Sequence, residues 1–433
     1  MKNDRIHLLC AGDLHLGRHP SHIPEEYDSS EYSPITIWEN IVRKAVDLQV
    51  DGLIISGDII DRKNRFYEAY GPFEAGIKKM EKEEIPVFVI SGNHDYEILP
   101  GIADNLDSDY FFLLGTNGKW ENQFLYKKNK PVLNIMGWSY PVRNVRQNPL
   151  KNFPEVKKED IPAVGLVHSE IDNPGSTYAP VSTDELQEMN ICGWITGHIH
   201  KPELKENFSS FVLNPGTPQP LDPGESGSHF VWEVFIESKT DYEFNKLELS
   251  SLKYEKVQID ISFMKHIEEL PALITKRIRR IISEKDFSAT VKLLIVRLTL
   301  SGNTEFTQEI ENIKDKLCYD LELNIAGIKV IVDEIYDSTS IKVDIEKLAE
   351  GNTPVSLIAE YIYKINSGKE EELPESLMET LEKKLLEVYN ANAYRPLRTE
   401  NRINSPDKKK IREILTDEGR KILNILAAQK EGE

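Results

Sequence analysis

A run of apolar residues that ends in a small residue and continues into polar residues recurs five times in the first 240 positions. The five stretches are IHLLCAGDLH at 6–15, GLIISGD at 52–58, VFVISGNHD at 87–95, AVGLVHSE at 163–170 and GWITGHIH at 193–200. Short continuous apolar runs predict strands that are covered on both faces. Helix-like stretches at 35–50 and 69–84 separate the first three runs. The pattern therefore predicts an α/β domain with polar groups at the carboxyl ends of its strands.

The pattern changes twice further along the chain. A Gly/Pro-rich loop at 213–230 leads into a closing strand, VWEVFIES, and residues 253–338 then mix strand-like and helix-like stretches. Helical periodicity dominates from residue 341 on, with helices predicted at 373–391 and 409–429. We therefore expect an α/β domain at 1–245, a small α+β domain at 250–340 and a helical C-terminal region at 341–433.

The composition is that of a soluble protein with more than one folded core. A chain of 433 residues exceeds one ordinary core, and 39% hydrophobic with 29% charged residues is typical of globular proteins. No apolar run approaches the roughly 18–20 residues that span a membrane, and the start has too short an apolar stretch for a signal peptide. Cys10, Cys192 and Cys318 lie far apart in apolar surroundings, which predicts buried free thiols in the reducing cytoplasm.

The net charge of −19 belongs mostly to the first domain. Residues 251–340 and 341–433 each carry a net charge of −2, which leaves −15 for residues 1–250. Such acidity disfavours tight unaided binding to DNA. A local basic stripe or bound divalent cations can still receive a phosphate group, so the charge does not exclude a phosphoester substrate.

The polar residues that follow the five apolar runs are of the types that bind metal ions. They are Asp13, His15, Asp58, Asp61, Asn93, His94, Asp95, His168, His198 and His200. Ligands of α/β folds bind beyond the carboxyl ends of the strands, so these groups are expected to converge. Two neighbouring divalent cations need a bridging carboxylate with imidazole and oxygen donors on either side. A single His or Asp after a strand is more often a surface or turn residue, but five such strand ends in one domain favour a joint metal site.

The motifs GDLH, GDIIDR, GNHD, VHSE and GHIH resemble the five signature blocks of the calcineurin-like metallophosphoesterases, in matching order and spacing over residues 1–235. The resemblance implies a four-layer α/β fold, in which a two-layer β-sandwich is flanked by helices. It also implies two divalent ions, commonly Mn²⁺, and an in-line attack on phosphorus. One ion would be held by Asp13, His15, Asp58 and His200, and the second by Asp58 as the bridge with Asn93, His168 and His198.

The same resemblance gives His94 a role other than metal binding. His94 is expected to protonate the leaving oxygen as a general acid, a contribution of roughly 10²–10⁴ in rate. Asp61, three residues after Asp58, is expected to accept a hydrogen bond from His94 and keep it protonated. Asp95 is interpreted as a structural turn residue, with support of a metal ligand as the alternative interpretation.

Metal chemistry alone does not separate a nuclease from a phosphatase or a cyclic-nucleotide phosphodiesterase. The Gly/Pro loop with the α+β domain and the helical tail is similar to the bacterial SbcD-type DNA repair exonucleases, and more closely to their YhaO branch. That resemblance implies 3′–5′ exonuclease and single-strand endonuclease activity on DNA, a homodimer, and a coiled-coil ATPase partner of the SbcC or YhaN type. An enzyme for small-molecule phosphoesters and a non-catalytic scaffold are the alternatives.

Basic residues at two places are the expected DNA contacts: Arg18, Arg62 and Lys63 near the metal motifs, and Lys276, Arg277, Arg279 and Arg280 in KRIRR. For KRIRR a solvated helix face is an equally good interpretation. No recognition helix or aromatic stacking run is present, so we expect specificity for DNA ends or structures. The C-terminal helices either pack on the α+β domain or dock a partner's helices, and the polar connector at 391–410 favours docking.

Overall fold

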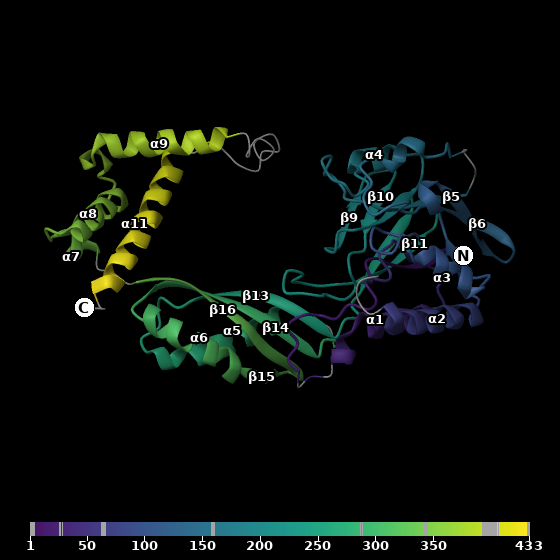
Figure 1. The fold of residues 1–433 in the computed structure, drawn as a ribbon, viewed down its shortest axis with the longest axis horizontal. Coiled ribbons are helices and arrows are strands. Elements are labelled where there is room, and N and C mark those ends of the chain that lie inside the picture. Colours follow the sequence, from purple (N-terminus) through teal and green to yellow (C-terminus); the bar gives the residue numbers. More distant parts are fainter. Residues whose placement is uncertain are drawn as a thin grey trace. The chain divides into compact units, whose positions relative to one another are not determined.

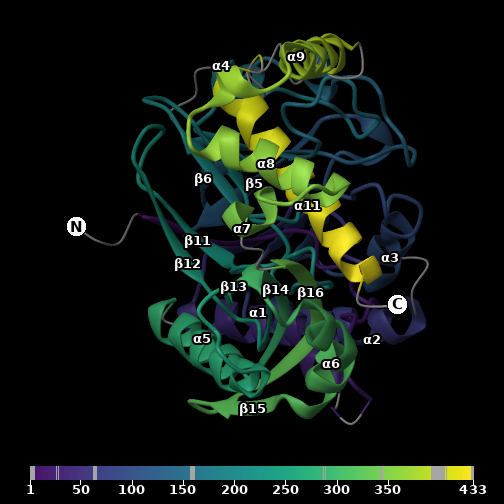
Figure 2. The ribbon, with the colours of Figure 1, turned by 90° about the vertical axis from the view of Figure 1, so that its left-hand side faces the viewer.

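The computed structural model of the chain describes residues 5–25, 27, 29–61, 66–156, 161–285, 287, 289–341, 345–391, 405 and 407–430. They form two compact units (Figures 1 and 2). The first unit consists of Met1–Val257, Ile278–Arg297 and Leu321–Asp333, and the second of Gln258–Arg277, Leu298–Asp320 and Glu334–Glu433. All of the metal-type residues predicted above belong to the first unit.

Two six-stranded sheets form the centre of the first unit. The first sheet has the order β12-β11-β1-β2-β3-β4, with β1 to β4 parallel and β11 antiparallel to β1. The second has the order β5-β6-β7-β8-β10-β9, with antiparallel strands only at its edges. The strands are β1 (Ile6–Ala11), β2 (Gly52–Ile55), β3 (Val87–Val89), β4 (Phe111–Leu113), β5 (Glu121–Lys127), β6 (Lys130–Trp138), β7 (Ala163–His168), β8 (Gly193–Gly197), β9 (Glu203–Glu206), β10 (Phe211–Asn214), β11 (Val231–Ile236) and β12 (Tyr242–Leu247).

The helices of this unit are α1 (Pro34–Leu48), α2 (Phe66–Lys82), α3 (Leu99–Leu106) and α4 (Thr183–Glu188). Helix α1 begins at a Ser33 cap, whose side chain accepts from the Thr36 amide, and Pro34 occupies the first turn without losing a hydrogen bond. It ends at Gln49, which adopts a left-handed conformation. The first two helices therefore lie where the sequence predicts them.

Three hydrophobic clusters separate the layers. Because side chains alternate along a strand, Leu8 and Cys10 of β1 face the cluster between the two sheets, while Leu9 and Ala11 face the cluster under α1, α2 and α3. A third cluster covers the other face of the second sheet and includes Leu186 of α4. The result is the expected four-layer fold of a β-sandwich flanked by helices.

Beyond β12 a four-stranded sheet has the order β13-β14-β16-β15, and its residues fall in both units. Its elements are β13 (Leu252–Asp260), β14 (Leu293–Thr304), β15 (Glu322–Ile325), β16 (Ile328–Ile341), α5 (Leu270–Glu284) and α6 (Thr307–Asp320). Cys318 of α6 is only half-buried, whereas Cys10 and Cys192 are buried as expected. The cause is helical periodicity, since Ile310 and Leu317 share the buried face of α6 and Cys318 is turned about 100° away from it.

The second unit ends in α7 (Ile345–Ala349), α8 (Pro354–Asn366), α9 (Glu375–Asn390) and α11 (Lys408–Lys430). Ala359 and Ile362 of α8 pack with Leu423 of α11 in a small core. Most of the connector predicted at 391–410 lies outside the described residues, and α11 begins within that range. Over the described part of the chain, no helix is long and apolar enough to cross a membrane.

Candidate metal centre

The loops that follow β1 and β2 are joined to each other by backbone hydrogen bonds. The Asp13 amide donates to the Gly57 carbonyl at 3.1 Å, and the His15 amide donates to the Asp58 carbonyl at 2.9 Å. Asp13, His15 and Asp58 have φ values of 49°, 48° and 49°, and His198 after β8 has 89°. Each such left-handed residue costs about 1–3 kcal/mol, which the surrounding structure has to offset. This concentration of strained backbone marks the strand ends as a functional site.

One group of ligand-type side chains consists of Asp13, His15 and His200, whose ligand atoms lie within 4.8 Å of one another. The two imidazoles face each other at 3.1 Å between their Nε2 atoms. Burial lowers the pKa of His15 to about 3, so its ring is neutral and keeps a lone pair for a cation. The other nitrogen of this ring, Nδ1, is buried without a hydrogen-bond partner in the described structure.

A second group surrounds Asp58. The Asp58 Oδ2 atom lies 3.2 Å from His168 Nε2. The Asn93 Oδ1 atom lies 3.2 Å from the same nitrogen and 3.1 Å from His198 Nδ1. Asp13 connects the two groups, because one of its carboxylate oxygens lies within 4.8 Å of an Asp58 carboxylate oxygen and of a His168 ring nitrogen. Contacts of this kind link all seven side chains, which are Asp13, His15, Asp58, Asn93, His168, His198 and His200.

This donor set fits two divalent cations. The carboxylates of Asp13 and Asp58 are both buried, and burial of an anion is costly without a compensating positive charge. Burial opposes a proton on His168, but the attraction of Asp58 raises the pKa of His168 to about 9. A cation that binds at this place competes with that proton, as metal binding generally does. Nitrogen and oxygen donors in this mixture suit Mn²⁺, Fe²⁺ or Zn²⁺.

His94 lies beside the two groups and faces Asp61. Its Nδ1 atom is 3.5 Å from Asp61 Oδ2, and its backbone amide donates to Asp58 Oδ1 at 2.9 Å. The hydrogen bond to Asp61 raises the pKa of His94 above its usual value. The His94 side chain is 35% exposed, so a substrate can reach it. His94 also forms a third group of possible ligands with His15 and Asp61.

Asp95 connects two of the strand ends. Its carboxylate accepts hydrogen bonds of 2.7 Å each from the amides of Ile59 and Gly92. It is fully buried, and burial raises its pKa to about 7. The turn interpretation therefore describes only part of its contacts, because Asp95 also fixes the loop after β2 that carries Asp58.

Two acidic residues contact the histidines of the site and were not singled out in the sequence. Glu225, in the Gly/Pro loop, lies 2.5 Å from His200 Nδ1 and also accepts from the Leu221 amide. Glu170 lies 4.0 Å from His198 Nε2. The neighbouring residues in the sequence do not indicate these contacts. Glu170 is nevertheless the last residue of the VHSE motif, and Glu225 lies in the Gly/Pro-rich loop.

The residues expected to contact DNA have different surroundings. The Arg18 amide donates to the His15 carbonyl, which places Arg18 next to the metal groups. Arg280 pairs with Glu284 at 2.6 Å, within α5. Lys276, Arg277 and Arg279 belong to the same helix. Arg62 and Lys63 lie outside the described residues.

The structure combines a four-layer sandwich with buried acids, an amide and four imidazoles at its strand ends. This combination defines a metal-dependent phosphoesterase. The calcineurin-like phosphoesterase family matches residues 6–202 of this chain. The match covers all five motifs that carried the resemblance.

Three relatives match parts of the chain. The chain is 25% identical over 307 residues to the "Uncharacterized metallophosphoesterase YhaO" of Bacillus subtilis, a match that covers 68% of this chain and 71% of that protein. It is also 30% identical over 90 residues to the DNA double-strand break repair protein Mre11 of Methanosarcina acetivorans and of Methanosarcina mazei. Those matches cover 21% of this chain and only 14% of either archaeal protein.

Two solved structures are more distant. One is the calcineurin-like phosphoesterase YfkN from Bacillus subtilis, with 12% identity, a TM-score of 0.36, and coverage of 65% of this chain and 99% of that chain. The other is a dimetal phosphatase from Danio rerio, with 12% identity, a TM-score of 0.34, and coverage of 57% and 99%.

Proposed function

We propose that this chain is a nuclease that hydrolyses DNA phosphodiesters with two divalent metal ions, as a 3′–5′ exonuclease and single-strand endonuclease. The observation that carries the proposal is the His94–Asp61 pair, which lies beside the shared carboxylate of Asp58. A positioned proton donor next to a metal-type centre suits the departure of a poor leaving group such as a sugar alkoxide. Similarity to the archaeal DNA double-strand break repair proteins supports DNA as the substrate.

In this proposal Asp13, His15, Asp58 and His200 would hold one ion, and Asp58, Asn93, His168 and His198 would hold the other. Two such ions, for which we propose Mn²⁺, would supply positive charge for the phosphoryl oxygens and would lower the pKa of an attacking water. The protein's own part is to orient these ligands and to hold a proton. His94 donates that proton from Nε2 to the leaving oxygen. Asp61 faces Nδ1 of the same ring, where it orients the ring and stabilises its protonated form.

DNA contacts in the proposal come from Arg18 beside the centre, from Arg62 and Lys63, and from Lys276, Arg277, Arg279 and Arg280 of α5. The net charge of −15 over residues 1–250 favours an assembly in which another protein supplies further basic surface. We therefore extend the proposal to a homodimer with a coiled-coil ATPase partner, docked by the region 341–433. Buried free thiols at Cys10 and Cys192 support a reducing compartment, the cytoplasm, and DNA repair is the proposed setting.

The test is an assay with Mn²⁺ in which the wild-type chain and a His94→Gln variant receive end-labelled single- and double-stranded DNA. Parallel reactions contain bis-p-nitrophenyl phosphate, whose leaving group needs little protonation. We expect stepwise shortening of DNA by the wild type and a loss of roughly 10²–10⁴ in kcat for DNA in His94→Gln. Hydrolysis of the activated diester should fall much less, because the proton donor contributes less to a good leaving group.

The outcomes separate the candidate functions. Hydrolysis of bis-p-nitrophenyl phosphate without any cleavage of DNA would replace the nuclease by an enzyme for small phosphoesters. Unchanged DNA cleavage in His94→Gln, with Mn²⁺ binding equal to that of the wild type, would contradict the proton-donor role.

A further inference from the structure

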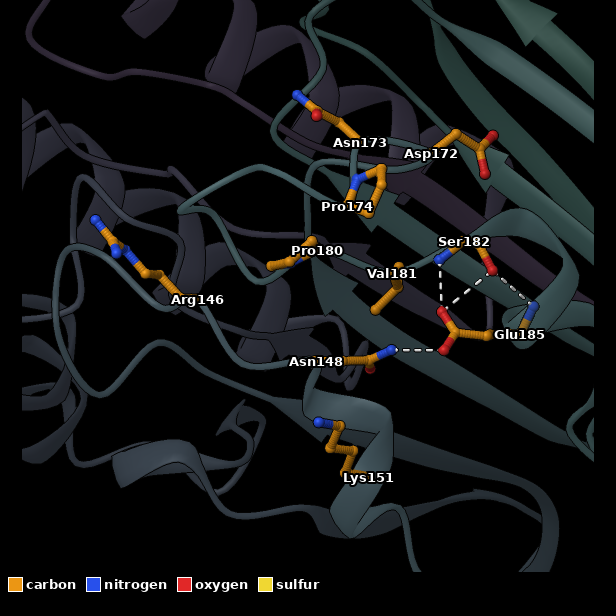
Figure 3. A pocket seen from close by; sticks show the side chains of 10 residues that line it. All are labelled: Arg146, Asn148, Lys151, Asp172, Asn173, Pro174, Pro180, Val181, Ser182 and Glu185. Carbon is orange, nitrogen blue, oxygen red and sulfur yellow. Dashed lines mark hydrogen bonds between the residues drawn. The ribbon is translucent and has the colours of Figure 1, made fainter. Parts of the chain in front are cut away.

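A hollow of about 390 Å³ opens on the first unit beside the loop that follows β7 (Figure 3). Its volume falls in the range of roughly 300–1,000 Å³ for sites that bind small molecules or parts of larger ones. Arg146, Asn148 and Lys151 line it from the segment after β6, and Pro174, Pro180 and Val181 line it from the loop after β7. Neither segment took part in the sequence motifs.

The walls of the hollow are continuous with those of the metal centre. Asn173, another lining residue, donates from Nδ2 to Glu170 at 3.0 Å, and Glu170 lies 4.0 Å from His198. On the other wall Val145 exchanges backbone hydrogen bonds with Thr177 and Ala179, at 2.8 and 2.7 Å. The residue between those two, Tyr178, lies against His198 with 4.6 Å between ring centroids. One extended loop therefore borders both the metal ligand His198 and the hollow.

The acidic residues of the hollow are already engaged by other groups. Asp172 binds Lys205 Nζ at 2.8 Å and accepts from the amide and hydroxyl of Thr183, also at 2.8 Å. Burial acts to raise the pKa of Asp172, but the hydrogen bonds from Lys205 and Thr183 outweigh it and hold this pKa below its usual value. Glu185 accepts from Asn148 Nδ2 at 2.9 Å and forms the capping box of α4 with Ser182, as Figure 3 shows. Both carboxylates thus have donors or a cation on their oxygens.

The basic residues are in the opposite situation. Arg146 and Lys151 are exposed, and neither forms an ion pair with any residue that the structure describes. In a domain of net charge −15, two such cations beside a hollow favour a negatively charged ligand. Pro174 is exposed and offers an apolar surface that can pack against a sugar or a base, whereas Pro180 and Val181, which also line the hollow, are buried.

We infer that this hollow binds a nucleotide of a single DNA strand whose neighbouring phosphodiester lies at the metal centre. Arg146 and Lys151 neutralise the phosphates of that nucleotide, and the proline-lined wall receives its sugar and base. A small diester held at the metal centre leaves the hollow empty, so the hollow favours polynucleotides over small phosphoesters. The inference rests on the proposed nuclease function and adds the place at which the strand is held.

A binding experiment tests it without requiring cleavage. In a His94→Gln background with Mn²⁺, a fluorescein-labelled single-stranded oligonucleotide is titrated at several KCl concentrations, and fluorescence anisotropy is measured. Arg146→Gln/Lys151→Gln should weaken binding at least tenfold. It should also reduce the slope of log K against log salt by about 1.4, because each phosphate contact on a single strand contributes about 0.7. The matched control, Lys79→Gln/Lys82→Gln on α2, removes the same charge from exposed positions of the same unit and should leave the slope unchanged.

Cleavage assays on proteins that retain His94 complete the test. The hollow variant should raise KM for the oligonucleotide while kcat/KM for bis-p-nitrophenyl phosphate stays within twofold of the wild type. Equal affinity and slope in the hollow variant and the control would overturn the inference, even where the wild type cuts DNA. A strand that binds through Arg146 and Lys151 but is never cut would overturn the proposed nuclease and leave this site in place.

Discussion

Glu225 contacts His200 from the Gly/Pro-rich loop. Its carboxylate lies 2.5 Å from His200 Nδ1, which leaves Nε2 of that ring to face His15. Carboxylates that bind the far nitrogen of a ligand histidine fix its tautomer and its orientation. The hydrogen bond with Glu225 also raises the pKa of His200, against the effect of burial.

We predict that Glu225→Ala weakens Mn²⁺ binding about 10–100-fold, whereas Glu225→Gln, which can still accept a hydrogen bond, weakens it less. Isothermal titration calorimetry of the metal-free protein measures both constants. Glu206→Gln, on the exposed edge strand β9, is the control and should bind as the wild type does. Equal affinity in Glu225→Ala would show that His200 is oriented without its help.

Gly92 shows why the strand ends carry small residues. A Cβ atom there would lie 2.2 Å from Asp58 Oδ1 and 2.8 Å from the Asp58 amide. A side chain would therefore occupy the space of the Asp58 carboxylate. The requirement for a small residue follows from the close approach of two loops, which only the packed sheet creates.

At the scale of elements, the loops after β2 and β3 act as one structure because Asp95 joins them. The two amides that it accepts from, of Ile59 and Gly92, lie on different loops and are buried with it. Removal of the carboxylate leaves buried donors without partners, at a cost of about 1–3 kcal/mol each.

We predict that Asp95→Ala lowers the free energy of unfolding by about 2–4 kcal/mol, as measured by urea denaturation in EDTA. It should also reduce Mn²⁺ affinity, because Asp58 loses its fixed position. Asp104→Ala, on the exposed face of α3, should change stability by less than about 0.5 kcal/mol. A loss in Asp95→Ala no larger than that of the control would mean that other contacts hold the two loops.

The sequence predicted the elements that carry the site better than those that complete the sheets. The parallel strands β1, β2, β3, β7 and β8 are short, continuous apolar runs, since both of their faces are covered. The edge strands β5, β9 and β12 alternate buried and exposed positions or are largely exposed, so they resemble surface loops in sequence. Pairing with a neighbour, which hydrophobic patterning does not reveal, makes them strands.

On the scale of the whole molecule, the three hydrophobic clusters around the two six-stranded sheets contain only residues numbered up to 249. Residues of α7, α8 and α11 form a separate small core around Ile362 and Leu423. The α/β domain that carries the metal-type residues therefore has hydrophobic clusters that do not include the C-terminal helices.

A chain truncated after Ile341 should keep two Mn²⁺ ions and hydrolyse bis-p-nitrophenyl phosphate within twofold of the full chain. Elemental analysis and steady-state kinetics check this, with circular dichroism to monitor folding. The truncated chain with Asp58→Ala gives the background rate of hydrolysis. Loss of metal from a folded truncated chain would mean that the C-terminal region contributes to the centre.

The sequence by itself determined the types of residue at each strand end, the α/β alternation and thereby the class of chemistry, because these are local patterns of a few consecutive positions. Tertiary structure alone decided that Glu225 holds His200, and that Arg146 and Pro180 line the same hollow. Such contacts join residues tens to nearly two hundred positions apart, as in the His15–His200 pair at a separation of 185. They exist because two sheets pack face to face and bring their loops to one edge, a consequence of the whole core that no single stretch of sequence contains.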